Sequence, residues 1–580
     1  MFSYLPSRIV IASLLTLNLA AGPTASAEQA AADVPDITIR TNTRLVVVDV
    51  VVTYKNGLPV PGLKPEDFTI EENGKKQKVS VFVPPGIQNR PAPAPVTPGI
   101  FSNHPESVAP AGVPTVLLLD ATNSSFLNQA YARSQMLQYV SEQSHAGQSI
   151  AVMTMSDRLR VLQEFTTDPQ ILLTAIRNFK PESRILQAAP PAPVSDMGGQ
   201  GGAMIASAAA QIASFANMQI GYDLERRTLI TIDAMHTLSR TLGGLPGRKN
   251  VVWLTANLPF DLIPEDRNMT DAELLADLPG QGRQRSVSVN GAGSLAAEAR
   301  TLHNQEIKDA ESQLASANIA IYPVDLRGLV GGMESLASRS EAHNSDIHGA
   351  GLANAALRQS GSLNASQDTM REVAQETGGK AYMNENEIKQ GVALAMADDK
   401  ASYTIGYYPE NKKWDGKYRT VKVKLSQADT EVRYRKGYFA VDTTQQKNPN
   451  YESDVAAAIL FNAPATQISF KAQAKPTDPG KMRVVFLVDA HTLTAEDAGG
   501  SRKMNVNFYA TVWGSGDKSL GAHTIKVDKA FDAATYQQIL DHGMMVPIDM
   551  DVPAGGTELR LAVLDNKTGF IGTVSGPLRQ

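Results

Sequence analysis

The sequence predicts a multidomain α/β plus β fold, with a doubly wound parallel sheet between two β-sandwich modules. The continuous apolar run Val116–Leu119 is typical of a central parallel strand that is buried on both faces. Strand-like and helix-like segments alternate through residues 113–400, as expected for a Rossmann-like open α/β sheet. Segments 37–84 and 456–580 instead show short strand patterns separated by turn residues, which favours a β-sandwich at each end.

The composition is that of a folded protein without a basic surface bias. The chain has 580 residues, of which 42% are hydrophobic and 19% are charged, and this suffices for several domains. A net charge of −5 argues against nucleic acid or an anionic membrane surface as the main partner. The absence of cysteine excludes disulfides, cysteine nucleophiles and cysteine metal sites, so core packing must hold the domains together.

The first 27 residues have the pattern of a secretory signal peptide. Arg8 supplies the positive region, and the apolar stretch Ile9–Ala21 is too short to span a bilayer. The small residues Ala25–Ala27 predict cleavage after Ala27. We therefore expect an exported protein, periplasmic or extracellular and cell-surface, with no transmembrane segment after cleavage.

The N-terminal β module is predicted over residues 37–84. Leu45–Val52 is mostly β-branched, and such side chains pack well on a pleated surface. The turn signals Lys55–Gly57 and Glu72–Gly74 separate its strands. A proline-rich linker over 85–112 is expected after this module.

The central domain, residues 113–400, is predicted from the order of its elements. After the strand that ends at Asp120 we expect a helix over 128–143, a buried strand over Ser149–Met155, an alternating antiparallel edge strand over Arg158–Phe165, a helix from Asp168 to Phe179, and later strands at Val251–Asn257 and Ile319–Asp325. Flexible insertions are predicted near residues 181–212, 260–295 and 329–366, where glycine, proline and polar residues gather.

Several strings resemble bacterial (acidobacterial-type) VWFA-related proteins, whose central domain is a von Willebrand factor A domain. They are the N-terminal run VVVDVVVTYKNGLPVPGLKPEDFTIEENGKKQKV, then LPGRKNVVWLT, IYPVDLRGL and VAQETGGKAY, and finally YTIGYYP with VRYRKGYF. The resemblance covers roughly residues 37–440. It implies an A-type domain flanked by β modules, with 401–440 as a β-rich extension of the A-type region.

Three oxygen-bearing side chains follow the first buried strand of the A-type domain. Asp120, Thr122 and Ser124 alternate after the carboxyl end of that strand, where ligands bind in open α/β sheets. Such oxygens suit a hard cation such as Mg²⁺, and the stretch resembles the D-x-S-x-S metal motif of A domains, with threonine in the middle position. The structural alternative is that Asp120 caps the next helix or orders the loop.

The rest of that metal motif is incomplete. The resemblance places a second aspartate at the end of the strand Val251–Asn257, but Ala256 stands where it would be expected. No residue in the glycine-rich insertion can be named for the second loop. Thr255 and Asp325 are weaker candidate ligands, and the pattern around Asp325 favours a cap or turn anchor. We therefore expect a degenerate site that binds Mg²⁺ or Mn²⁺ weakly or not at all, and no certain cofactor.

The C-terminal domain is predicted as an Ig-like β-sandwich over residues 456–580, after a linker at 441–455. Its expected strands are Met482–Leu487, Asn505–Val512, Leu520–Val527, Met544–Met550 and Leu559–Leu564.

No pattern for catalysis is found, so no catalytic residue is named and an enzyme is not expected. The chain lacks a G-x-S-x-G elbow, an H-E-x-x-H string and a phosphate-binding loop. Two functions remain. The first is a secreted protein-binding or adhesion protein that uses the A-type domain with its degenerate metal site. The alternative is a structural or assembly scaffold of the bacterial cell envelope with a metal-free A domain. The sequence does not identify the protein partner.

Overall fold

The computed structural model describes residues 45–86, 99–109, 112–142, 148–181, 222–259, 306–327, 366–383, 388–440 and 451–578, apart from a few single positions within these ranges. The expected signal peptide and most of the three expected insertions lie outside the described residues. No helix in the described part of the chain is long and apolar enough to cross a membrane.

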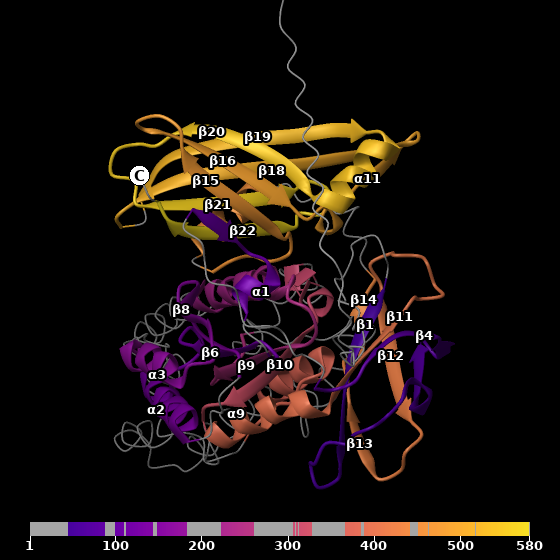
Figure 1. Ribbon diagram of the computed structural model, residues 1–580. Coiled ribbons are helices and arrows are strands. Elements are labelled where there is room, and N and C mark those ends of the chain that lie inside the picture. The colour runs from indigo at the N-terminus through magenta and orange to yellow at the C-terminus, as the bar shows by residue number, and fades with distance from the viewer. Residues whose placement is uncertain are drawn as a thin grey trace, which may run out of the picture. The chain divides into compact units, whose positions relative to one another are not determined.

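A five-stranded, mostly parallel sheet forms the centre of the α/β region (Figure 1). Its strands, in spatial order, are β10 (Ile319–Asp325), β9 (Lys249–Thr255), β6 (Thr115–Asp120), β7 (Ile150–Met155) and β8 (Leu159–Thr166). Only β8 runs antiparallel, and it lies at the edge of the sheet. Every residue of β6, β7, β9 and β10 is buried, as a strand with two covered faces requires.

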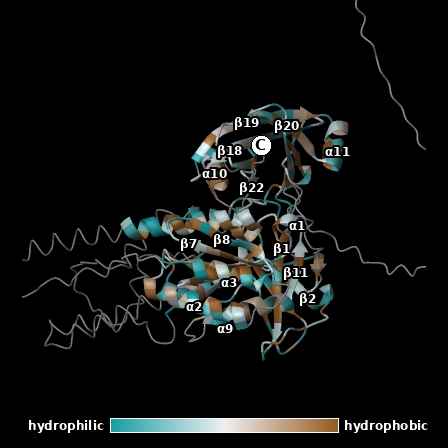
Figure 2. Ribbon diagram, turned by 60° about the vertical axis from the view of Figure 1, so that its left-hand side comes forward, coloured by the Kyte–Doolittle hydropathy of each residue, from teal (hydrophilic) through white to brown (hydrophobic). Residues whose placement is uncertain are grey.

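Helices cover both faces of this sheet. On one face α2 (Phe126–Glu142), α3 (Pro169–Asn178) and α9 (Ile388–Ala397) pack on the strands, and the buried core there includes Leu117, Met136, Tyr139, Ile176 and Val392. On the other face helices 222–242 and 366–377 contribute Leu238, Leu242, Met370 and Val373 to a core that contains Trp253. The ribbons of α2 and α3 carry both teal and brown segments in Figure 2, as amphipathic helices do.

The strand order places a switch point at β6. The chain runs from β6 to β7 on one side of the sheet, and later returns to β9 on the other side of β6. In open α/β sheets the crevice at such a point, beyond the carboxyl ends of the strands, is the usual place for a ligand. Asp120 is the last residue of β6, so the fold puts it at that position.

A second module is a sandwich of two four-stranded sheets, built from two distant parts of the chain. One sheet is ordered β13-β1-β11-β4 and the other β14-β12-β2-β3. The bounds are β1 (Val46–Tyr54), β2 (Phe68–Glu72), β3 (Lys75–Gln77), β4 (Val79–Val83), β11 (Ser402–Tyr407), β12 (Tyr418–Leu425), β13 (Thr430–Arg433) and β14 (Gly437–Phe439).

Strand pairing joins the segments 37–84 and 401–440, which the sequence analysis treated as separate regions. β1 pairs with β11 and β13, and β2 pairs with β12, all in antiparallel register. The two sheets share one core, which includes Val48, Phe68, Ile70, Tyr403 and Val421. The α/β region is therefore inserted between strands of a single sandwich, and both of its ends are held by that module.

The C-terminal module is also a two-sheet sandwich. Its sheets are ordered β20-β16-β15-β5 and β17-β18-β21-β22, and β19 pairs with β18. The bounds are β15 (Phe470–Pro476), β16 (Lys481–Val488), β17 (Glu496–Ala498), β18 (Ser501–Gly514), β19 (Lys518–Phe531), β20 (Met544–Asp551), β21 (Glu558–Asp565) and β22 (Ile571–Pro577), with helix α11 (Ala533–His542) between β19 and β20.

Two segments expected to be linkers contain regular structure. Within 85–112, β5 (Ile100–Ser102) pairs with β15, and the short helix α1 (Pro105–Val108) comes directly after it. Near the end of 441–455, α10 (Tyr451–Leu460) begins and packs Val455 and Ile459 against β21 and β22. A strand of three residues has too little local pattern to be recognised from sequence, and only its partner β15 defines it.

Candidate functional site

Asp120 is buried at the end of β6, and its carboxylate accepts four hydrogen bonds. The backbone nitrogen of Asn123 donates to Oδ1 at 2.9 Å, and the side-chain amide of Asn123 donates to Oδ2 at 3.0 Å. Oδ2 also accepts from the Trp253 indole nitrogen at 3.1 Å and from the Thr255 hydroxyl at 2.8 Å. Three of these hydrogen bonds therefore converge on Oδ2 and one reaches Oδ1.

The strand register explains why β9 supplies two of these donors. β6 and β9 are parallel, with Leu118 opposite Trp253 and Leu119 opposite Leu254. Trp253 and Thr255 are two residues apart on β9, so their side chains leave the same face of the strand. Both therefore reach the carboxylate at the end of β6.

Thr122 and Ser124, the other two residues of the motif, are also engaged. The Thr122 hydroxyl donates to the backbone oxygen of Met155 at 3.2 Å and also contacts that of Ser156. The Ser124 hydroxyl accepts a hydrogen bond from the Ala256 backbone nitrogen at 3.0 Å. The structure thus brings Asp120, Ser124 and Thr255 together, but it turns the Thr122 hydroxyl toward the end of β7.

The protonation of Asp120 is set by two opposing effects. Burial raises the pKa of the carboxyl, while the hydrogen bonds from Asn123, Thr255 and Trp253 lower it in part, and the net shift is upward. The single hydroxyl proton of Thr255 has a second acceptor, the Asn257 carbonyl at 2.6 Å.

This donor set does not fit a divalent cation. A Mg²⁺ or Mn²⁺ ion needs free oxygen lone pairs, normally from one or two carboxylates together with waters. Here the positive ends of an indole N–H and two amide N–H groups point at the one carboxylate. In the described part of the chain, no group of three or more His, Asp or Glu side chains is placed to hold a metal ion. The expected degenerate metal motif is occupied by hydrogen bonds instead.

Asp325 does not join this cluster. It is the last residue of β10, and its carboxylate accepts from the Arg327 guanidinium at 2.8 and 2.9 Å and from the Arg327 backbone nitrogen at 3.0 Å. The Gln367 amide adds a fourth donor at 3.2 Å. Asp325 therefore orders the turn after β10 through a bidentate arginine pair, the alternative that the sequence left open.

Sequence reasoning missed the two residues that close the site, Asn123 and Trp253. Trp253 lies in a continuous apolar run and reads as a core residue, which it also is. A buried indole nitrogen nevertheless needs an acceptor, and the carboxyl end of the neighbouring strand is the nearest polar place. This need for an acceptor is the feature of the sequence that could have identified Trp253 as part of the site.

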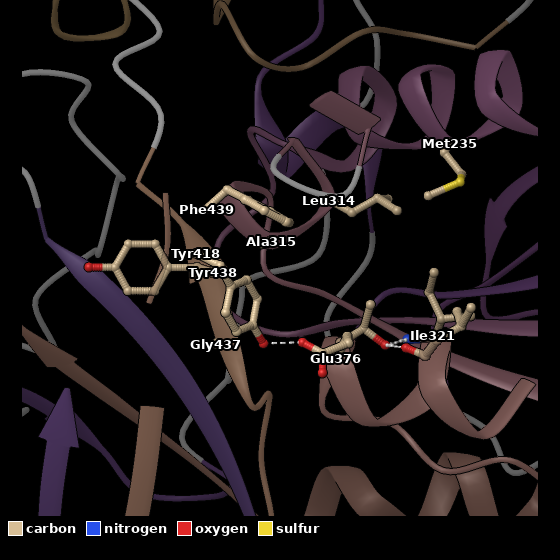
Figure 3. Close-up of a pocket in the computed structure, with 11 residues that line it drawn as sticks. Met235, Leu314, Ala315, Ile321, Glu376, Tyr418, Gly437, Tyr438 and Phe439 are labelled. Atoms are coloured by element: carbon tan, nitrogen blue, oxygen red, sulfur yellow. Dashed lines mark hydrogen bonds between the residues drawn. The ribbon is translucent and has the colours of Figure 1, made fainter. Parts of the chain in front are cut away.

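A separate small cavity lies between helix 366–377 and the sandwich strands β12 and β14 (Figure 3). Its volume is about 30 Å³, room for roughly two water molecules. Its lining is mostly apolar, with Leu314, Ile321 and Phe439 among the residues drawn. The half-buried carboxyl of Glu376 lies at this cavity and accepts a hydrogen bond from the Tyr418 hydroxyl.

No family model matches the chain, and no curated protein matches it. Among solved structures, an aerotolerance-related membrane protein from Bacteroides fragilis NCTC 9343, carrying multiple mutations to serines, is similar over 50% of this chain and 100% of that chain, with 13% identity and a TM-score of 0.21. An endonuclease/exonuclease/phosphatase from Beutenbergia cavernae DSM 12333 is similar over 32% of this chain and 39% of that chain, with 10% identity and a TM-score of 0.13. Neither likeness is close enough to define a fold or a function.

Proposed function

We propose that the chain is an exported, non-catalytic protein-binding protein whose A-type domain engages its partner without a metal ion. The observation that carries the proposal is the Asp120 carboxylate at the switch point, which accepts hydrogen bonds from Asn123, Trp253 and Thr255 and is not part of any group of three or more His, Asp or Glu side chains among the described residues. The export signal in the first 27 residues and the lack of a catalytic motif support the other parts of the proposal.

Exposed apolar side chains on α2, the helix that follows Asp120, form a surface that a protein partner could contact. Phe126 and Leu127, the first two residues of α2, are 47% and 49% exposed. Tyr131, one turn after Leu127 on the same helix face, is 38% exposed. Aromatic and aliphatic side chains next to an ordered polar loop are typical of a protein-binding surface.

A site-specific cross-linking experiment tests the proposal in the producing cells. A photoreactive residue at position 127 of the full chain should capture a defined protein. The same residue at position 171 is the matched control, because Ile171 is 43% exposed but lies in the first turn of α3, at the opposite edge of the sheet. Capture from 127 should be unchanged by a chelator and lost in Phe126→Ser. Equal capture from both positions, or loss on chelation, would contradict the proposal.

The scaffold function remains a second candidate because one observation favours it. The modules are interlocked. β1 and β2 precede the A-type region and pair with β11 and β12, which come after it, while β5 belongs to the C-terminal sandwich. Replacing Phe126 and Leu127 by serine separates the two functions. A scaffold should keep its association with the envelope fraction, whereas a protein that binds through α2 should lose its partner.

A further inference from the structure

A polar cleft lies where the α/β region meets helix α10, and Asp120 is not among the residues that line it. Its volume is about 300 Å³, within the size range of sites for small ligands. Three elements line it: the start of β8, the middle of helix 222–242, and the end of α10 with the residue after it. The Asp120 site and the exposed end of α2 take no part in this lining, so a ligand held in the cleft would be independent of the proposed function.

One wall of the cleft carries a cation. Arg158, directly before β8, and Arg160, the second residue of that strand, both line the cleft. The Arg160 guanidinium forms a bidentate pair with Asp157, at 2.7 and 2.9 Å, and this pair holds the pKa of Asp157 at about 2. The Arg158 side chain is exposed and makes no hydrogen bond or ion pair with the described residues. Its planar guanidinium is therefore available for a carboxylate.

A second wall carries a carboxylate. Asp233, on helix 222–242, has a side chain that is 55% exposed. Its only ion pair with a described residue is a long one, 3.9 Å to Arg240, and Arg240 also lies 3.7 Å from Asp454. One guanidinium is thus shared by two carboxylates, so Asp233 keeps much of its negative charge toward the cleft.

The third wall is apolar. Leu460, the last residue of α10, is 43% exposed, and Phe461 next to it is half-buried. Ala457 lies one turn before Phe461 and is also exposed. Leu460 and Phe461 line the cleft together with Arg158 and Asp233, and Phe461 also packs against the core of the α/β region.

We propose that this cleft binds a short peptide with free ends and at least one apolar side chain. The peptide carboxylate pairs with Arg158, its ammonium group pairs with Asp233, and its apolar side chain packs on Leu460 and Phe461. The opposite charges on separate walls select a zwitterion over a simple anion, and the apolar wall selects against small polar zwitterions.

Calorimetric titration of the full chain tests this with dileucine that is free at both ends, N-acetylated, or C-amidated. We expect the free peptide to bind, and Arg158→Gln to weaken binding at least about tenfold, as loss of a charge-assisted pair does. Amidation should cause a similar loss in the wild type and no further loss in Arg158→Gln. N-acetylation should likewise weaken binding to the wild type and cause no further loss in Asp233→Asn. Arg226→Gln, an exposed arginine elsewhere on helix 222–242, is the matched control and should bind like the wild type.

Two results would overturn the proposal. One is the absence of heat up to about 10 mM free peptide, a concentration that would reveal even a millimolar Kd. The other is equal binding of the free and amidated peptides by wild type and Arg158→Gln, which would place the peptide elsewhere on the chain. Both substituted side chains are exposed, so the variants should fold, and circular dichroism would verify this.

Discussion

The indole nitrogen of Trp253 lies 3.1 Å from Oδ2 of Asp120 and donates a hydrogen bond to it. The two residues come from neighbouring parallel strands, so this contact joins β6 to β9 at the edge where a ligand would approach. An indole N–H is a donor only and cannot turn into an acceptor. The contact therefore fixes Asp120 as a hydrogen-bond acceptor within the fold.

Trp253→Phe should destabilise the α/β region because it removes this donor while keeping an aromatic ring. We expect a loss of about 1–3 kcal/mol, the usual range for a bond to a buried polar or charged group. Trp513→Phe is the matched control: its indole donates at 2.8 Å to a neutral acceptor, the Thr511 hydroxyl. Scanning calorimetry of both variants checks the difference. Equal losses would mean that the ring volume matters and the Asp120 bond does not.

Millimolar Mg²⁺ or Mn²⁺ should leave the thermal unfolding of the wild type unchanged. A ligand that binds only the folded state raises its stability by mass action, but N–H groups of Asn123 and Trp253 already point at the Asp120 carboxylate. Asp120→Asn serves as the comparison, measured with the same ions and with a chelator. A rise in unfolding temperature in the wild type that is absent from Asp120→Asn would contradict this expectation.

The central sheet could be predicted from the sequence because its signals are local. Two local patterns each specify a strand without reference to its partners: the continuous apolar run before Asp120 and the alternation over Arg158–Phe165. In the structure they form strands β6 and β8. The VAQETGGKAY string ends at Tyr382, which forms a single parallel bridge with Val324 of β10.

The pairing of distant segments could not be predicted. Val50 lies opposite Tyr403, and Gln473 lies opposite Ile100, although hundreds of residues separate each pair. Sheet partners at such distances leave no local pattern in one sequence. The sequence predicts Asp120 at the carboxyl end of a buried strand, and it is the last residue of β6. Its hydrogen bond from Trp253 could not be predicted, because in sequence an apolar run does not distinguish a core tryptophan from one that also donates a hydrogen bond.

Arg248→Met should be strongly destabilising, because Arg248 joins the α/β region to the N-terminal sandwich. Its guanidinium donates to the Tyr322 hydroxyl and the Gly378 carbonyl, both at 2.8 Å, and lies 3.8 Å from the buried Asp49. Removing it would leave the Asp49 charge buried without its nearest cation, which typically costs about 3–5 kcal/mol.

Chemical denaturation of the full chain would measure this loss. Adding Asp49→Asn to Arg248→Met should restore part of the stability, because it removes the uncompensated charge. Arg483→Met, in an exposed pair with Asp549, is the matched control and should change stability little. If the two arginine variants were equally stable, the buried pair would not hold the modules together.

Glu376→Gln should remove a pH-dependent contribution to the free energy of unfolding, which arises where helix 366–377 contacts the sandwich. Burial raises the pKa of the Glu376 carboxyl above the ordinary value of 4.5, although the Tyr418 hydrogen bond and the charge of Lys436 oppose the rise. The folded protein therefore holds this proton at pH values where the unfolded chain has already lost it. Its contribution to stability is complete below pH 4.5 and is lost as the pH rises through the folded-state pKa.

Glutamine keeps the acceptor for Tyr418 and has no proton to lose. The free energy of unfolding of the wild type, relative to Glu376→Gln, should therefore fall as the pH is raised above 4.5 and then level off. Tyr418→Phe sharpens the test, because without its hydrogen bond the pKa of Glu376 should rise further and the fall should move to higher pH. Urea unfolding of the three proteins across this pH range measures both effects. Parallel curves for wild type and Glu376→Gln would show that Glu376 titrates in the folded protein as it does in the unfolded chain.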